Sequence, residues 1–236
     1  MVVADKQRIV HHRLLAPALA PARVVENARC AMYSEAHLLL SAASAAQFPP
    51  DEGVEVAIAG RSNAGKSTAL NALTGRRALA RASKTPGRTR LINFFELAPG
   101  QRLVDLPGYG YAAGARGERD QWAALMEALI PRRSLRGLIL VVDARRGLQE
   151  ADAQLIDWAH SHQCLVHVLL SKCDQLRRND ARALLTRVQA QLRARAAAQL
   201  FSARDGTGLE AARKLLAAWL GEPESRGTPK KEPRQS

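Results

Sequence analysis

The fold of this chain is decided by the stretch Gly60-Arg61-Ser62-Asn63-Ala64-Gly65-Lys66-Ser67. It fits the pattern G-x-x-x-x-G-K-[ST], follows a strand-like apolar segment at 54–59 and opens a helical segment expected over 66–73. The glycines let the backbone curl so that several N–H groups point inward, and the helix N-terminus adds the positive end of its dipole. The pattern predicts a loop that binds nucleotide phosphates, with Lys66 on the β- and γ-phosphates and Ser67 on Mg²⁺.

Strand-like and helix-like segments alternate outward from this loop. We expect strands at 54–59, 91–97, 102–104, 138–142, 165–170 and 200–202, and helices at 66–73, 119–129, 150–160, 180–198 and 209–220. The turn Pro99-Gly100 makes the second and third strands an antiparallel pair. The order predicts an α/β domain with a mostly parallel six-stranded sheet and helices on both faces.

The flanking segments differ in composition from this core. Residues 1–34 are interpreted as an N-terminal extension, 35–221 as the domain, and the polar, Pro-rich residues 222–236 as a disordered tail. The Ala-rich stretch 35–46 is expected to form a short helix on the domain edge. With no long apolar run, no secretory signal and only Cys30, Cys164 and Cys173, the chain is expected to be cytoplasmic and to make no membrane contact. It is also expected to be a monomer.

Two further segments suit the metal and the γ-phosphate. Asp105-Leu106-Pro107-Gly108 ends a strand, where the carboxylate can hold Mg²⁺ through a water and the Gly108 N–H can meet the γ-phosphate. The stretch Ser83-Lys84-Thr85-Pro86-Gly87-Arg88-Thr89-Arg90 is polar and rich in chain breakers, so we expect it to be mobile without ligand. Either threonine hydroxyl could complete the Mg²⁺ shell when a γ-phosphate is bound.

The base is expected at two more strand ends. In Ser171-Lys172-Cys173-Asp174 the carboxylate can accept both the ring N–H and the exocyclic amine of guanine, a donor pair that adenine lacks. The Lys172 stem can cover the base plane, and the Ala203 N–H in Phe201-Ser202-Ala203 can donate to the guanine carbonyl. The order of these segments favours GTP over ATP, although an ATP-dependent kinase or ATPase is the competing hypothesis.

The segments together resemble the translation-factor branch of GTPases, and three of them are similar to the EngB family of bacterial GTPases. The closer matches are 60–67, 84–89 and the stretch Asp105-Leu106-Pro107-Gly108-Tyr109-Gly110-Tyr111-Ala112. The resemblance implies a Ras-like domain that binds GTP and GDP with Mg²⁺, acts in assembly of the large ribosomal subunit and is needed for normal cell division and septation. It also implies that Thr89, not Thr85, is the threonine that ligates Mg²⁺, with Ser67 as the other protein ligand, while Asp105 is expected to hold the ion through a water.

The expected site therefore combines all of these segments. The catalytic residues would be Asn63, Lys66, Thr89 and Gly108. The nucleotide-binding residues would be Gly60, Arg61, Ser62, Asn63, Ala64, Gly65, Lys66, Ser67, Thr68, Gly87, Arg88, Thr89, Arg90, Leu91, Asp105, Leu106, Pro107, Gly108, Ser171, Lys172, Cys173, Asp174, Phe201, Ser202 and Ala203.

Three positions shape the expected reaction. Ras-type enzymes orient the attacking water with a Gln after the Asp-x-x-Gly segment, and here Tyr109 stands there, which predicts slow intrinsic hydrolysis. Asn63 suggests stimulation by K⁺, because related GTPases hold that ion with an Asn at this position; a local backbone cap is the alternative role. Ser171 replaces the usual Thr or Asn, so nucleotide affinity is expected to be weaker.

The charge balance points to a polyanionic partner. The formal net charge is +13, with 35 Lys and Arg against 22 Asp and Glu. Basic side chains gather near the fourth helix and near the loop at 83–90: Arg177, Arg178, Arg182, Arg187, Arg193 and Arg195, then Arg76, Arg77, Arg81, Lys84, Arg88 and Arg90. Both sets predict contact with ribosomal RNA phosphates, and a solvated helix face is the alternative interpretation of the first set. The alternative function is an RNA-binding assembly factor in which the nucleotide only stabilises the fold.

Overall fold

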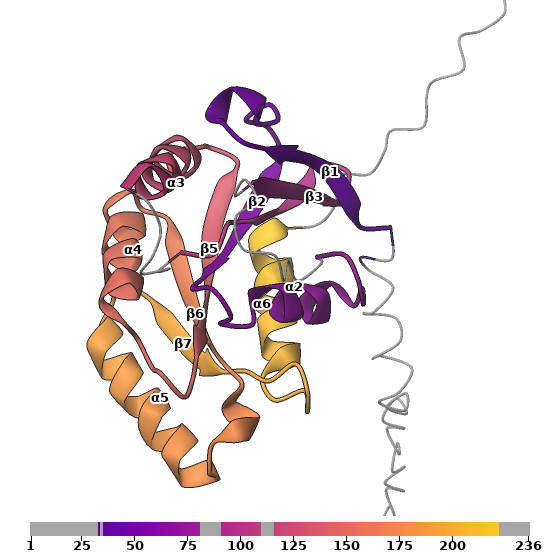
Figure 1. Cartoon of the computed structure of the whole chain (residues 1–236). Helices are drawn as coiled ribbons and strands as arrows, with labels where there is room; N and C mark the ends of the chain where they lie inside the picture. Colours follow the sequence, from indigo (N-terminus) through magenta and orange to yellow (C-terminus); the bar gives the residue numbers. More distant parts are fainter. Residues whose placement is uncertain (1–32, 34, 81–90, 110–115, 222–236) are drawn as a thin grey trace, which may run out of the picture. The chain divides into compact units, whose positions relative to one another are not determined.

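The computed structural model describes residues 33, 35–80, 91–109 and 116–221 (Figure 1). Its sheet has the strand order β1-β3-β4-β2-β5-β6-β7. The strands are β1 (His37–Ala42), β2 (Val54–Gly60), β3 (Ile92–Ala98), β4 (Gln101–Asp105), β5 (Leu135–Asp143), β6 (Leu165–Ser171) and β7 (Ala197–Leu200). The helices are α2 (Lys66–Thr74), α3 (Arg116–Leu129), α4 (Glu150–Ser161), α5 (Arg178–Leu192) and α6 (Leu209–Leu220), with single turns η2 (Ala45–Gln47) and η3 (Cys173–Gln175).

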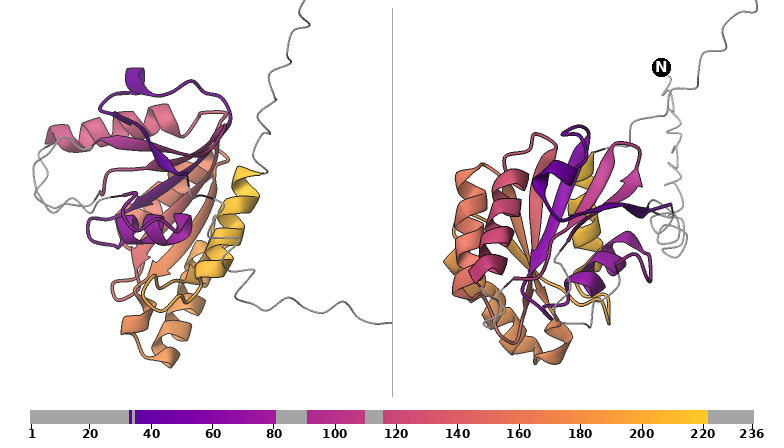
Figure 2. Two further views of the ribbon diagram at one scale, coloured as in Figure 1. Left: turned by 90° about the vertical axis from the view of Figure 1, so that its right-hand side faces the viewer. Right: turned by 45° about the horizontal axis from the view of Figure 1, so that its top comes forward.

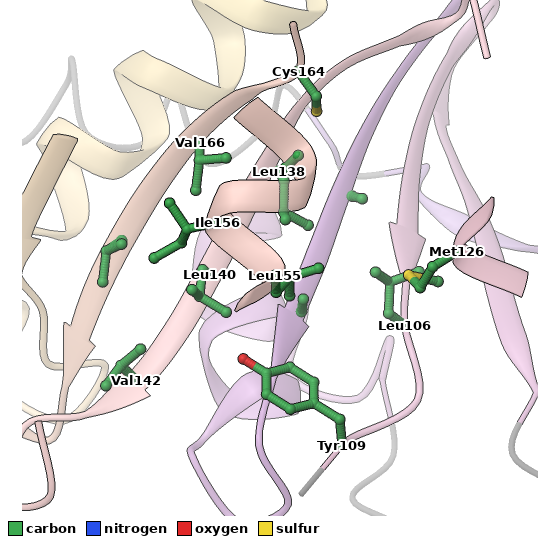
Figure 3. Close-up of a cluster of buried hydrophobic side chains, with 14 of the residues drawn as sticks. Leu106, Tyr109, Met126, Leu138, Leu140, Val142, Leu155, Ile156, Cys164 and Val166 are labelled. Atoms are coloured by element: carbon green, nitrogen blue, oxygen red, sulfur yellow. The ribbon is translucent and has the colours of Figure 1, made fainter. Parts of the chain in front are cut away.

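The helices cover both faces of the sheet, as predicted (Figure 2). Alternate residues of β5 point to opposite faces, so that Leu138 and Leu140 belong to one apolar cluster and Ile139 and Val141 to another. Apolar residues of α3, α4 and α5 complete the first cluster, part of which Figure 3 shows. Those of α2 and α6 complete the second. Strands buried on both faces explain why β5 and β6 are continuous apolar runs.

The sheet is parallel from β4 through β2, β5 and β6 to β7, and antiparallel at β1, β3 and β4. The predicted hairpin around Pro99 and Gly100 is confirmed, with Gly100 at φ 74°. Within the described part of the chain, no helix has the length and apolarity that crossing a bilayer requires. The predicted extension, the loop at 83–90 and the predicted tail lie outside the described residues, apart from Tyr33.

The prediction of a helix over 35–46 is wrong, and the sheet therefore has seven strands where six were expected. Residues 37–42 form β1, which pairs antiparallel with β3 from His37–Glu96 to Ala42–Ile92. The Ser41 Oγ also donates to Asn93 Oδ1 at 2.7 Å. Pairing with the open edge of β3 outweighs the helix propensity of the alanines, and only the single turn η2 remains helical.

The prediction for 180–198 places the end of that helix too late. The helix α5 ends at Leu192, and Arg193 adopts a positive φ of 53°. Residues 197–200 then form β7 beside β6, so the strand expected at 200–202 lies earlier in the chain. The sequence Arg-Ala-Arg-Ala-Ala-Ala at 193–198 contains neither Gly nor Pro, and pairing with β6 is what ends the helix.

A buried carboxylate fastens the opposite end of the sheet from the phosphate loop. Glu55 on β2 is fully buried and accepts from Arg102 Nε at 2.8 Å and from Arg132 Nε at 2.9 Å. The Arg132 guanidinium also donates to the carbonyls of Pro49 and Pro50. This cluster connects the chain before β2 to the starts of β2 and β5. The two guanidinium groups compensate the negative charge of the buried Glu55 carboxylate.

We expect Glu55→Gln to lower the free energy of unfolding by about 3 kcal/mol, because it removes the buried carboxylate that pairs with two nearly buried guanidinium groups and leaves Arg132 only the Asp51 carboxylate, 3.9 Å away. Urea denaturation of the variant and the wild type measures this difference. The exposed Glu52→Gln is the matched control and should change the free energy by less than about 0.5 kcal/mol. Equal stability of Glu55→Gln and the wild type would contradict the assignment.

Candidate functional site

The sequence segments singled out above meet at one edge of the sheet. The strands β2, β4, β5 and β6 run parallel, so their carboxyl ends lie together. The register places Ile58 beside Asp105 and Asp143 beside Ser171. The loop at 60–65, the segment 105–108 and the segment 171–174 are thereby brought to the same edge, as the sequence predicts.

The loop before α2 has a backbone suited to binding an anion. Gly65, the N-cap residue of α2, has φ 99°, and Asn63 has φ 64°. A Cβ at Gly60 would lie 2.6 Å from the Val141 carbonyl oxygen, so no larger residue fits there. No side chain caps α2, and its first turn holds no acidic residue. The first N–H groups of α2 therefore lack an intrahelical partner and a side-chain cap.

Two carbonyls of this loop point toward β6. The Lys172 Nζ donates to the Asn63 carbonyl oxygen at 2.6 Å, and the Ser171 Oγ lies 2.5 Å from the Ala64 carbonyl oxygen as its donor. Ser171 is buried, so its hydroxyl needs such a partner. Bonding of these carbonyls to the end of β6 fixes the backbone of the loop, in which the Ser62 and Ala64 N–H groups donate to the Tyr109 and Arg61 carbonyls.

Lys66 and Asp105 form a direct ion pair in the structure. Their side chains are only 13% and 10% exposed, so both charges are largely removed from water and each compensates the other. The Asn93 Nδ2 lies 3.5 Å from the second carboxylate oxygen. When a nucleotide binds, a phosphate would take the place of the Asp105 carboxylate as partner of the Lys66 ammonium, and a cation would take the place of Lys66 as partner of Asp105. Each residue would thus keep a partner of opposite charge to its own, which fits the predicted roles of both.

The two segments expected to read the base are neighbours. Cys173 donates its backbone N–H to the Phe201 carbonyl, and the Ser202 Oγ donates to Asp174 Oδ1 at 2.8 Å. The Ser202 Oγ also accepts the backbone N–H groups of Arg204 and Asp205 at 3.2 and 3.3 Å, which fixes its orientation. One oxygen of the Asp174 carboxylate is thus held in place by the loop that carries Ala203.

Asp143 is a site residue that the sequence reasoning missed. Its carboxylate accepts the Lys172 Nζ at 2.9 Å and the Arg145 Nε at 2.9 Å. The hydrogen bond from Arg145 is the largest influence on the pKa of Asp143, and with that from Lys172 it lowers the pKa far below its usual value in spite of burial. The signal was present in the sequence, because Asp143 ends a strand as Asp105 does.

The remaining expected residues divide into two groups. Ser67 and Thr68 lie in the first turn of α2, and Leu91 is half-buried directly before β3. Gly87, Arg88, Thr89 and Arg90 lie outside the described residues. In the part of the chain that the structure describes, no three His, Cys, Asp or Glu side chains gather as a metal site would require. Ser67 and Asp105 offer oxygen donors, the ligand type that Mg²⁺ takes together with phosphate oxygens.

The chain is similar to known proteins in sequence and in architecture. Residues 55–172 match the domain family described as a 50S ribosome-binding GTPase. A probable GTP-binding protein EngB of Coxiella burnetii is 48% identical over 192 residues, covering 80% of this chain and 94% of the relative. One of Nitrosococcus oceani is 48% identical over 194 residues, covering 80% and 97%.

The fold is also found among solved structures. The crystal structure of a probable GTP-binding protein engB superposes with a TM-score of 0.56 at 20% identity, covering 71% of this chain and 98% of that one. The extent of the sequence match to the curated relatives, together with the phosphate loop and its Ras-like sheet, leads to one conclusion. The chain belongs to the EngB family of GTP-binding proteins and is a GTPase.

Proposed function

We propose that this protein is a guanine-nucleotide switch that acts in assembly of the large ribosomal subunit and supports normal cell division and septation, as a cytoplasmic monomer. The observation that carries the proposal is the convergence of 60–67, 105–108, 171–174 and 201–203 around the carboxyl ends of parallel strands. The ribosomal part is supported by the description of the matching family, a 50S ribosome-binding GTPase.

The side chains at the site divide the nucleotide between them. Asp174 would accept two hydrogen bonds from guanine, and Lys66 would neutralise charge on the β- and γ-phosphates. The hydroxyl groups of Ser67 and Thr89 would ligate Mg²⁺ directly, and the Asp105 carboxylate would hold it through a water. Bound there, Mg²⁺ stabilises charge on the phosphate oxygens during hydrolysis. Gly108 would present its N–H to the γ-phosphate.

We propose that intrinsic hydrolysis is slow because the residue after Gly108 cannot activate water. The Tyr109 hydroxyl is buried and donates to Asp152 Oδ1 at 2.6 Å. Burial, followed by the charge and hydrogen bond of Asp152, raises the pKa of Tyr109 well above its usual value. The hydroxyl stays protonated at neutral pH and is already committed as a donor, so it does not act as a general base.

RNA of the large subunit is the proposed macromolecular partner. The side chains of Arg177, Arg178, Arg182, Arg187 and Arg193 are exposed on α5 or directly beside it. Arg195 is half-buried, and its guanidinium bonds to Asp157 and to the Gln191 carbonyl. The five exposed arginines, in a chain of net charge +13, suit contact with phosphate groups.

The variant Asp174→Asn tests whether Asp174 recognises the guanine base. We expect GDP affinity to fall about 100-fold, because the carboxamide presents a donor to the guanine amine, and xanthosine diphosphate to bind better than GDP, since xanthine has a carbonyl there. Calorimetric titration with GDP, GTP, ATP and xanthosine diphosphate measures this. The exposed Asp180→Asn is the control. Wild-type protein that binds ATP as well as GTP would overturn the proposal.

Measuring binding to ribosomal particles tests whether the large subunit and its RNA are the partner. We expect the protein with a non-hydrolysable GTP analogue to sediment with the large subunit, with log K falling linearly with log salt. Arg178→Glu with Arg182→Glu should reduce the magnitude of that slope by about one for each phosphate that is no longer bound, whereas Arg136→Glu, on β5, should not. Binding that ignores both nucleotide and salt would count against the proposal.

Potassium tests the role of Asn63. We expect GTP hydrolysis to be about tenfold or more faster in KCl than in NaCl, because a cation beside the phosphates would stabilise transition-state charge as an arginine finger does. Asn63→Ala should remove the difference while GDP affinity is retained, as measured by phosphate release. Equal rates in the two salts would refute this role.

A further inference from the structure

Tyr109 is held on two sides by residues outside its own segment. Its hydroxyl donates to Asp152 Oδ1 at 2.6 Å, and its carbonyl accepts the Ser62 N–H at 3.2 Å. A parallel bridge also pairs Tyr109 with Arg61. The side chain is therefore bound by α4 and the main chain by the phosphate loop. In Figure 3 the Tyr109 ring lies at one end of the apolar cluster, below Leu140 and Leu155.

Gly108 is confined between anchored neighbours. A Cβ at Gly108 would lie 3.3 Å from both Cα and N of Ser62, so the glycine packs closely on the phosphate loop. On its other side, the Pro107 carbonyl accepts the Trp122 Nε1–H at 3.3 Å, and the Trp122 ring lies 5.5 Å from that of Tyr109. The orientation of the Gly108 N–H thus depends on how residues 107 and 109 are held.

Only one of the two oxygens of the Asp152 carboxylate takes part in helix capping. Its Oδ2 accepts the Gln149 N–H at 2.8 Å, which caps the first turn of α4. Its Oδ1 serves Tyr109, 43 residues earlier in the chain. Burying a carboxylate that is only 1% exposed is costly unless both oxygens are bonded, so the hydroxyl is a required partner and a phenylalanine at 109 would not be equivalent.

Arg61, in the phosphate loop, lies close enough to this carboxylate for its charge to act on it. Burial raises the pKa of both Tyr109 and Asp152, and the positive charge of Arg61 offsets part of that rise. Among the described residues its Nε is buried without a hydrogen-bond partner. Arg61, Gln149 and Asp152 also line a cavity of about 20 Å³, which is room for about one water. Asp152 thus bonds Tyr109 directly, and the charge of Arg61 acts on this pair from the phosphate loop.

We propose that Asp152 is a positioning residue for the GTPase reaction, which holds Gly108 in place for the γ-phosphate through its bond to the Tyr109 hydroxyl. This rests on the proposed role of Gly108. Because GDP has no γ-phosphate, a displaced Gly108 N–H affects binding of the triphosphate alone. A residue that only stabilises the fold would weaken both nucleotides equally.

Tyr109→Phe is the decisive variant, since it removes one oxygen and keeps the ring in its apolar cluster. We expect affinity for a non-hydrolysable GTP analogue to fall about tenfold and GDP affinity to stay within about twofold, which corresponds to loss of one hydrogen bond to a charged group. The hydrolysis rate at saturating GTP should also fall. Fluorescent-nucleotide competition gives the two affinities, and thermal unfolding without nucleotide shows whether the fold is intact.

A double-mutant cycle tests whether the loss of GTP affinity comes from the hydrogen bond between Tyr109 and Asp152. Asp152→Ser keeps a short polar side chain near the α4 cap but cannot reach Tyr109, so it should resemble Tyr109→Phe, and the double variant should be no worse than either. The exposed Gln154→Ala on α4 is the control.

Three outcomes are distinguishable. An unchanged ratio of GTP to GDP affinity in Tyr109→Phe, or additive effects in the cycle, overturns the positioning role while the proposed function stands. Wild-type protein without guanine preference would instead remove the proposed function itself.

Discussion

The nucleotide site depends on how the backbone N–H and carbonyl groups of the phosphate loop are hydrogen-bonded. A loop that turns its N–H groups toward phosphates must turn carbonyls elsewhere, and buried carbonyls need donors. Here Ser171, at the end of β6, supplies the donor to the buried Ala64 carbonyl, and Lys172 bonds the exposed carbonyl of Asn63. The phosphate loop is therefore shaped by a neighbouring strand as well as by its own glycines.

This arrangement links recognition of the two ends of the nucleotide. The segment that braces the phosphate loop continues within two residues to Asp174, the proposed reader of guanine. Lys172 has φ 58°, a conformation uncommon for a side chain of its size, and Asp143 holds its ammonium from the other side. The hydrogen bonds from Arg145 and Lys172 lower the pKa of Asp143 in spite of burial, so its carboxylate is charged at neutral pH.

Much of this could be read from the sequence because each site segment follows a strand directly and parallel strands end together. The prediction failed where tertiary pairing overrode local propensity: residues 37–42 became β1 and residues 197–200 became β7, although both lie in alanine-rich sequence. The contact of Tyr109 with Asp152 was also beyond sequence reasoning. Asp152 looks like an ordinary first-turn carboxylate, and only the packing of α4 against the sheet brings it to the tyrosine.

The edge position of β1 matters for anyone who shortens this protein. A fragment that begins after Ala43 would lose the partner of β3 and leave the outer backbone groups of that strand unsatisfied, with Phe94 and Phe95 among its residues. Unprotected strands of this kind join other molecules edge to edge and aggregate. Expression fragments and fusion junctions should therefore lie upstream of Tyr33, even when only nucleotide binding is of interest.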